Sequence, residues 1–167
     1  MPNKEESARQ RRLRLAREKR MAVRRRVFEV GREILASERV KSQRLFVQHG
    51  RWSVYAHALQ VAIRSVAIAR FLGVRYDERA LIRGALLHDY FLYDWHEDDP
   101  SHRWHGYIHA ARALDNAKRD FALGAKERDI IRHHMFPLNL FHPPRCREAL
   151  IVCLADKLVA VCETVRR

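Results

Sequence analysis

Histidine and aspartate recur inside apolar, helix-like stretches of this chain, and this placement constrains its fold more than any other feature. The stretch Leu86-Leu87-His88-Asp89 places an imidazole beside a carboxylate at the end of an apolar segment. Other apolar periodic segments contain His57, His109, His133, His134 and Asp156. A buried carboxylate is costly unless it is paired or binds a metal. A fold that gathers these side chains could therefore hold a divalent cation.

Length and composition favour one soluble helical domain. The chain has 167 residues, of which 47% are hydrophobic, and it contains only six glycines and five prolines. That is enough chain for a substantial core, and so few turn residues favour helices over a many-turn β fold. No apolar run reaches the roughly 18–20 residues of a membrane span, and the N-terminus lacks the apolar core of a signal peptide. We therefore expect a cytoplasmic protein without membrane contact.

Hydrophobic periodicity predicts helices over most of the chain. Ser53 and Asp77 are suited to capping helix N-termini, and Gly73 is suited to ending a helix. No segment alternates with period two for long enough to predict a strand. The expected fold is an all-α, compact multi-helix bundle with a basic N-terminal extension. The predicted helices cover residues 27–35, 53–71, 77–89, 106–118, 125–135 and 145–165.

The first 26 residues are crowded with lysine and arginine, and the chain has a formal net charge of +13. Such an arm could bind nucleic acid or an acidic membrane surface. A solvated, partly disordered tail is the usual alternative, and no aromatic residue interleaves the basic ones before Phe28. Translation that starts at Met21 is a further alternative. We divide the chain into a basic, flexible arm of residues 1–26 and a helical domain of residues 27–167.

The order of the histidines and aspartates resembles the HD-domain superfamily of metal-dependent phosphohydrolases, from about residue 50 to the end. Four stretches carry the resemblance: His57-Ala-Leu-Gln-Val-Ala, Arg83-Gly-Ala-Leu-Leu-His88-Asp89, Ile130-Ile-Arg-His-His134 and Leu154-Ala-Asp156-Lys157. The resemblance implies an all-α domain whose metal ligands converge from several helices. It implies a first metal ion held by His57, His88, Asp89 and Asp156. A second ion would be held by His109 and His134, with Asp89 as the bridge.

Several assignments stay open at this point. His105 shares a helical face with His109 and competes for the second-metal role, although the spacing from His109 to His134 fits the superfamily better. His133 would be an adjacent or third-site ligand. For catalysis we expect Asp89 and Lys157. The candidate phosphate contacts are Arg64, Arg83 and Lys157.

A mixed histidine and carboxylate set suits one or two ions of Mn, Fe, Ni, Co or Zn better than Mg. Such ions bind phosphate oxygens and acidify a bridging water. We expect a metal-dependent phosphohydrolase that acts on a nucleotide or another small phosphomonoester or phosphodiester. The alternatives are a non-catalytic, metal-containing regulatory module whose basic arm binds nucleic acid, and a di-iron HD-type oxygenase. The expected partner is a small phosphorylated substrate, with a homodimer as a further option.

The residues after His88-Asp89 depart from the resemblance. Many bimetallic members continue with Ile-Gly-Lys, whereas this chain has Tyr90-Phe91-Leu92. The change removes a glycine turn and a lysine that contacts phosphate. The chain resembles small bacterial HD-domain proteins with His-Asp-Tyr-Phe-Leu-Tyr-Asp-Trp at this place, and that resemblance transfers no substrate.

Overall fold

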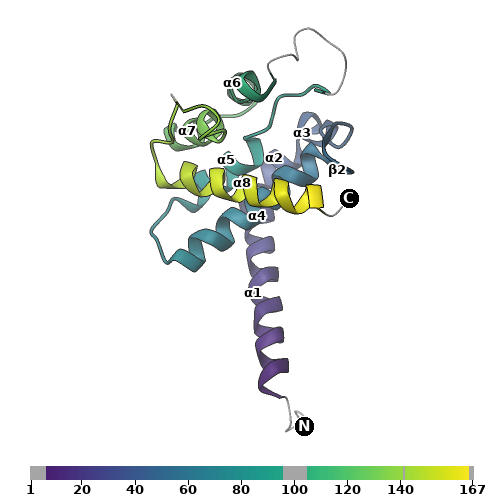
Figure 1. Cartoon of the computed structure of the whole chain (residues 1–167), viewed down its shortest axis with the longest axis vertical. Helices are drawn as coiled ribbons and strands as arrows, with labels where there is room; N and C mark the ends of the chain where they lie inside the picture. The colour runs from purple at the N-terminus through teal and green to yellow at the C-terminus, as the bar shows by residue number, and fades with distance from the viewer. Residues whose placement is uncertain (1–6, 96–104, 141, 166–167) are drawn as a thin grey trace.

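The computed structural model describes residues 7–95, 105–140 and 142–165, which form helices and one short hairpin (Figure 1). The hairpin pairs β1 (Val47–His49) with β2 (Trp52–Ser53) in antiparallel fashion. None of the described helices is both long and apolar enough to cross a membrane. The helices are α1 (Ala8–Val30), α2 (Arg32–Ala36), α3 (Glu38–Ser42), α4 (Val54–Leu72), α5 (Glu78–Leu87), α6 (His105–Asp120), α7 (Ala125–His133) and α8 (Arg147–Val165).

The predicted caps set the bounds of α4 and α5. Ser53 Oγ accepts a hydrogen bond from the backbone N–H of Ala56, and Asp77 Oδ1 accepts one from Ala80. Each cap satisfies a donor that has no partner within the helix. Gly73 ends α4 with φ of 63°, a left-handed conformation that glycine adopts without steric cost. These boundaries confirm the predictions from sequence.

The core lies where α4 packs against α5 and α8, while α7 packs against α5, α6 and α8. In Figure 1, α8 crosses in front of α4, and α6 and α7 lie at the opposite side of the bundle from the free end of α1. This packing brings four places together: the first turn of α4, the C-terminal ends of α5 and α7, and the middle of α8. The largest apolar side chains that are fully buried include Ile34, Leu81, Ile82, Leu87, Ile130 and Ile131.

The β1–β2 hairpin is a difference from the prediction of no strand. Its strands have three and two residues, and Gly50 between them has φ of 60°. A strand this short has no room for a period-two pattern, so sequence periodicity could not reveal it. The all-α class is confirmed for the described bundle, and the hairpin adds one polar side chain, Gln48, to its interior.

Residues 8–26, expected as a solvated arm, are helical and continue into the helix that was expected to begin near residue 27. Ser7 and Gln10 form a reciprocal capping box at the start of α1. Arg14 and Glu18 form an ion pair one turn apart on the helix. The buried residues of α1 are Val23 and Val27, so the helix is anchored near its C-terminal end while its N-terminal part extends away from the bundle (Figure 1).

We predict that Gly84→Ala destabilises the fold at the α5–α7 contact. A Cβ atom at Gly84 would lie 2.6 Å from Ile130 Cδ1 and 2.9 Å from Ile130 Cβ. The overpacking should outweigh the roughly 1 kcal/mol gain in helix propensity and lower the free energy of unfolding by about 1–2 kcal/mol. Urea denaturation measures the change. Gly106→Ala is the control, because the nearest described atom to its Cβ would be Leu138 Cδ2, 3.6 Å away; equal stability of the two variants would contradict the prediction.

Candidate metal centre

Two groups of buried side chains meet at one carboxylate, that of Asp89. One group is His57, His88 and Asp89, and the other is Asp89, His109 and His134. Within each group the potential ligand atoms all lie within 4.8 Å of one another. The histidines come from α4, the end of α5, α6 and the end of α7. These two groups contain five of the six residues predicted as metal ligands.

Each oxygen of Asp89 faces one pair of histidines. Asp89 Oδ2 lies 3.3 Å from His88 Nε2 and 3.8 Å from His57 Nε2. Asp89 Oδ1 lies 3.3 Å from His134 Nε2 and 3.4 Å from His109 Nε2. The Nε2 atoms of His109 and His134 are themselves 2.9 Å apart. A carboxylate placed in this way could bridge two cations.

Asp156, the sixth predicted ligand, reaches the first group from the middle of α8. Its Oδ1 lies 3.1 Å from His57 Nε2 and 3.7 Å from His88 Nε2. The carboxylate therefore contacts the same two nitrogen atoms that face Asp89 Oδ2. Asp156 is placed to complete the first set of ligands.

Hydrogen bonds on the far side of the rings aim three histidines at the centre. His57 Nδ1 lies 2.8 Å from Glu163 Oε2. His88 Nδ1 lies 2.8 Å from the carbonyl oxygen of Ala85, and His134 Nδ1 lies 2.9 Å from that of Ile131. When each Nδ1 donates to its oxygen, the lone pair stays on Nε2, the atom that faces Asp89. This arrangement fixes the tautomer that a metal requires.

Sequence reasoning missed three residues that support the centre. Glu163 lies seven residues after Asp156 in α8, so helical spacing in an apolar segment could have revealed it. Gln48 Nε2 donates to Asp89 Oδ2 over 2.7 Å, and Gln43 Nε2 donates to the Asp89 carbonyl over 2.9 Å. Both glutamines precede α4 in the α3–β1 region, where the sequence carries no signal that they would lie beside Asp89.

Among the described residues, the buried ligand atoms His88 Nε2 and Asp89 Oδ1 have no partner in hydrogen-bonding geometry. An unpaired buried polar atom costs about 1–3 kcal/mol. A divalent cation in each ligand group would satisfy these atoms, one cation at His88 Nε2 and the other at Asp89 Oδ1. The donor set of imidazole nitrogens and carboxylate oxygens also matches the preferences of transition metals. The residues present therefore fit a bound metal.

Charge compensation sets the protonation of the centre before a metal binds. Burial lowers the pKa of His57, but hydrogen bonds to Asp156 and Glu163 outweigh burial and raise it to about 9. Burial raises the pKa of Asp89, but the neighbouring His88 charge and hydrogen bonds with the histidines hold it well below its usual value. Burial lowers the pKa of His134. The carboxylates are thus ionised at neutral pH, and a cation would displace protons from the imidazoles.

The structure corrects the expectation that Arg83 contacts phosphate. Its side chain is buried, with Nε 2.6 Å from Glu127 Oε1 and Nη1 2.8 Å from Glu33 Oε2, and Nη2 donates to the carbonyl of Ala122. A buried guanidinium needs partners for its donors, and here they come from α2, α7 and the loop before α7. Arg64 is exposed on α4, and its predicted contact with phosphate stays a prediction.

His133, predicted as an adjacent or third-site ligand, lies outside both ligand groups. Its Nδ1 lies 2.7 Å from Asp129 Oδ1, and its ring stacks on His142 with an interplanar angle of 17°. Adjacent residues on a helix point about 100° apart, so His133 turns away when His134 faces Asp89. The side chain of His105, the alternative ligand for the second ion, lies outside the described part of the chain.

Two cationic side chains lie close to the ligands. Lys157 Nζ donates to the carbonyl of His134 over 3.2 Å. Arg112, which sequence reasoning missed, follows His109 by three residues, and its guanidinium lies 4.9 Å from the ring centre of Tyr93. Tyr93 contacts Phe91, whose ring meets that of His109 edge-on. The spacing of three residues from a predicted ligand is the signal that could have found Arg112.

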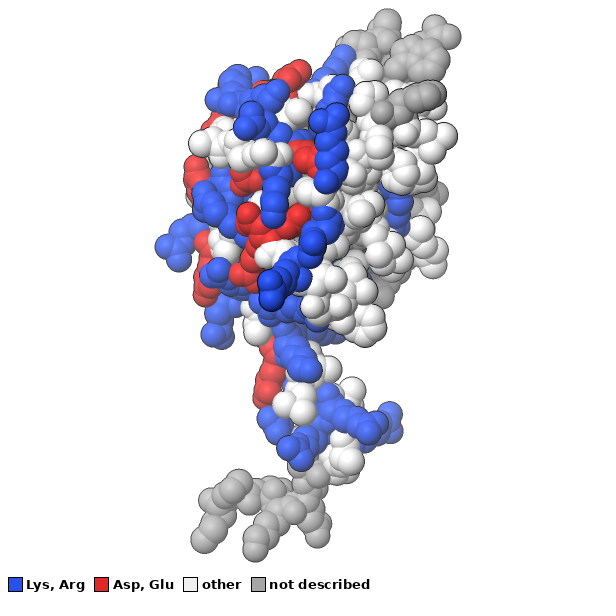
Figure 2. Space-filling view, turned by 90° about the vertical axis from the view of Figure 1, so that its left-hand side faces the viewer, with Lys and Arg blue, Asp and Glu red and all other residues white. Residues whose placement is uncertain are grey.

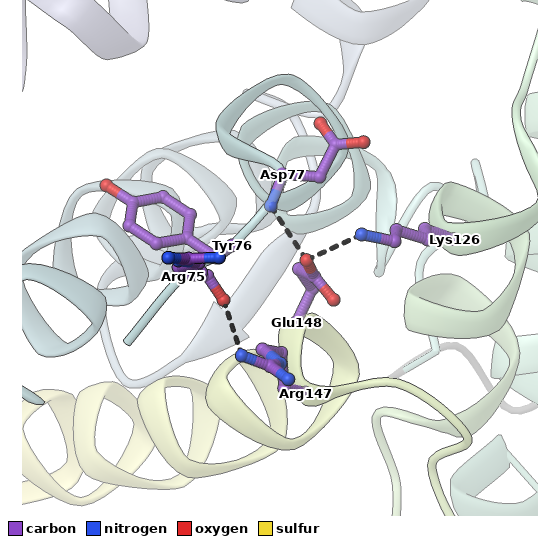
Figure 3. A pocket seen from close by; sticks show the side chains of 6 residues that line it. All are labelled: Arg75, Tyr76, Asp77, Lys126, Arg147 and Glu148. Atoms are coloured by element: carbon purple, nitrogen blue, oxygen red, sulfur yellow. Dashed lines mark hydrogen bonds and ion pairs between the residues drawn. The ribbon is translucent and has the colours of Figure 1, made fainter. Parts of the chain in front are cut away.

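A separate pocket lies at the opposite end of α5 from His88 (Figure 3). The N-termini of α5, α7 and α8 converge on it. Glu148 Oε1 accepts hydrogen bonds from the backbone N–H of Asp77 and from Lys126 Nζ, over 2.7 and 2.9 Å. Arg147 donates to the carbonyl of Arg75. Because the carboxylate of Glu148 already occupies the positive end of α5, the pocket is a structural junction apart from the metal centre.

We predict that the adjacent histidines of α7 differ in their effect on metal affinity. His134→Ala should weaken Mn²⁺ binding by more than the roughly 10–100-fold that an outer-shell change costs, because it removes a ligand. His133→Ala should leave the affinity within about twofold, since its ring pairs with Asp129 instead. Titration of metal-stripped protein against a chromophoric chelator gives both affinities. Equal losses in the two variants would contradict the geometry.

Of three comparisons with known proteins, the one with family models gives a match, and it agrees with this geometry. No curated protein and no solved structure matches the chain. The family model described as HD domain matches residues 54–161, which covers α4 through most of α8. The match spans more than half of the chain and includes every predicted metal ligand. The chain belongs to the HD domain family.

Proposed function

We propose that the protein is a metal-dependent phosphohydrolase that acts on a nucleotide or another small phosphomonoester or phosphodiester. The observation that supports this most strongly is the position of Asp89, one buried carboxylate between two pairs of histidines. Membership in the HD domain family, whose members are generally metal-dependent hydrolases, supports the same chemistry. The mixed donor set favours one or two ions of Mn, Fe, Ni, Co or Zn over Mg.

The proposal assigns six residues to metal binding. Bound divalent ions would polarise phosphate oxygens and lower the pKa of a water molecule. The first ion would be held by His57, His88, Asp89 and Asp156, and the second by Asp89, His109 and His134. Glu163, Gln48 and the carbonyls of Ala85 and Ile131 keep these ligands oriented. Because the ligands are already oriented, the protein would not need to reorganise when the bound ions contact the substrate.

Lys157 and Arg112 are proposed to offset the negative charge of the phosphate. Lys157 follows Asp156 in α8, and its ammonium group already contacts the backbone of His134. Arg112 follows His109 by one turn of α6, and its side chain is half-buried. Cations fixed near the reacting phosphate stabilise charge that develops in the transition state. Of the contacts predicted by sequence, Lys157 is thus kept, and Arg112 takes the place of Arg64 and Arg83 beside it.

We predict that Asp89→Asn abolishes phosphatase activity measured with p-nitrophenyl phosphate and its bis-ester in the presence of Mn²⁺ or Ni²⁺. The loss should be at least about 100-fold, because the bridging charge is removed from a preorganised site. Asp129→Asn is the matched control, since Asp129 also pairs with a histidine but lies outside both ligand groups. Activity that survives Asp89→Asn overturns the proposal. Resident iron with oxygen consumption and no phosphatase activity would support the di-iron oxygenase instead.

We predict that Arg112→Gln raises KM for the phosphoester by roughly 10–100-fold, the effect of losing one hydrogen bond to a charged group. Arg64→Gln removes the same charge from the exposed face of α4 and should leave KM unchanged. Steady-state kinetics on both variants provide the measurement. An equal rise in KM for the two variants would show that Arg112 acts only through the net charge of the protein.

A further inference from the structure

Helix α1 carries most of the excess positive charge of the protein. Residues 8–26 include nine arginines and Lys19 against a single acidic residue, Glu18, which gives +9 of the total of +13. Every residue from 7 to 22 is exposed. Figure 2 shows the helix as a mainly basic stalk, whereas acidic and basic side chains are mixed on the visible face of the bundle. This charge lies outside the metal centre, so the proposed hydrolase activity does not account for it.

The cations surround α1 rather than forming one stripe. At about 100° per residue, Arg9, Arg14 and Arg26 point in three widely separated directions. The exposed apolar side chains Leu13, Leu15 and Met21 do not gather on one face either, because Leu15 points about 160° away from Leu13 and about 120° away from Met21. A helix that lies in a membrane interface needs such an apolar face. Single-stranded nucleic acid is bound largely by base stacking on aromatic rings, and residues 8–26 contain no aromatic residue.

We propose that α1 binds double-stranded DNA by lying in the major groove and contacting phosphates of both strands. Arginine, which outnumbers lysine nine to one here, binds phosphate in bidentate fashion. An α-helix of roughly 10–12 Å diameter fits the major groove of B-DNA, which is about 12 Å wide. The exposed residues 8–22 span about 22 Å, less than one turn of DNA at about 34 Å. The corresponding groove of double-stranded RNA is too narrow for this fit.

The bundle fixes the direction of α1. Val23 and Val27 are buried against it, and Arg26 Nε lies 2.6 Å from Glu78 Oε2 on α5. These contacts hold the C-terminal part of the helix, and the capping box at Ser7 stabilises its start. A preformed helix loses less conformational entropy on binding than a disordered arm does. The binding surface is thus ordered before DNA arrives.

The test measures binding of the full chain to a fluorescein-labelled 24-bp DNA duplex of mixed sequence by fluorescence anisotropy. The variant carries Gln in place of Arg11, Arg12, Arg17 and Arg20, none of which pairs with an acidic residue in the described part of the chain. Glutamine keeps nearly the helix propensity of arginine. We expect Kd at about 50 mM salt to rise at least tenfold, and the slope of log Kobs against log salt to become about 3 units shallower.

The control removes the same charge from the bundle, with Gln in place of Arg51, Arg79, Lys118 and Arg128, which are all exposed. Its slope should stay within about 1 unit of the unmodified chain. Circular dichroism confirms that α1 stays helical in both variants. If the first variant misfolds, the slope of log Kobs against log salt for the unmodified chain tests the proposal. A slope steeper than about −4 supports the proposal, and a shallower slope overturns it.

Three further results would overturn the proposal. The first is an equal loss of affinity in the two variants, which would indicate net charge alone. The second is tighter binding to an RNA duplex of the same length. The third is binding to phosphatidylserine vesicles without binding to the DNA duplex. Because the readout is DNA binding, failure here leaves the proposed hydrolase activity untouched, and loss of that activity in Asp89→Asn does not affect this test.

Discussion

The buried carboxylate of Asp89 is the constraint on which the rest of the structure depends. An ionised carboxylate removed from water costs several kcal/mol unless charges and hydrogen bonds replace its hydration. Here four imidazoles and the amide of Gln48 take that role. The partners come from the hairpin, α4, the end of α5, α6 and α7. The helices must therefore meet at one point, and the fold can be understood as the packing that lets them do so.

The contacts between α5 and α7 maintain this convergence. Gly84 allows α5 to approach Ile130 closely, and Arg83 links α5 to Glu127 of α7 and to Glu33 of α2. Since His88 follows α5 and His134 follows α7, the register between these two helices sets the position of both ligands relative to Asp89. Arg83 thus contributes to the metal centre by fixing the helices that carry it.

The residues after His88-Asp89 fasten a third helix. Tyr90 donates a hydrogen bond to Asp120, and Asn116 donates to the carbonyls of Tyr90 and Phe91. These bonds tie α6 to the end of α5. Leu92 has φ of 61°, so the chain makes a left-handed turn there without glycine. The stretch Tyr90-Phe91-Leu92 therefore contains a turn, but it lacks the lysine of the Ile-Gly-Lys pattern.

Sequence reasoning was accurate where the interacting residues lie close together in the chain, and it failed where they come from different helices. Local signals predicted the caps at Ser53 and Asp77 and the end of α4 at Gly73, because capping involves residues three or four positions apart. Ligands were found where apolar periodicity made a buried polar residue conspicuous, as with His57 and Asp156. Arg64 and Arg83 were judged only by their distance along the chain from a ligand, and this distance says nothing about partners from another helix. Arg64 is exposed on α4, and Glu33 and Glu127 engage Arg83.

The sequence alone was enough to predict that the chain is helical and that histidines and aspartates placed inside its apolar segments could hold divalent cations. Those properties depend on local periodicity and on the high cost of burying charge, and both can be read from residue types and spacing. Only the tertiary structure decided that Asp89 lies between the two histidine pairs, that His134 rather than His133 faces it, and that Glu163 and Gln48 complete the arrangement. These outcomes depend on helix rotation and register, which are set by packing between segments far apart in the chain.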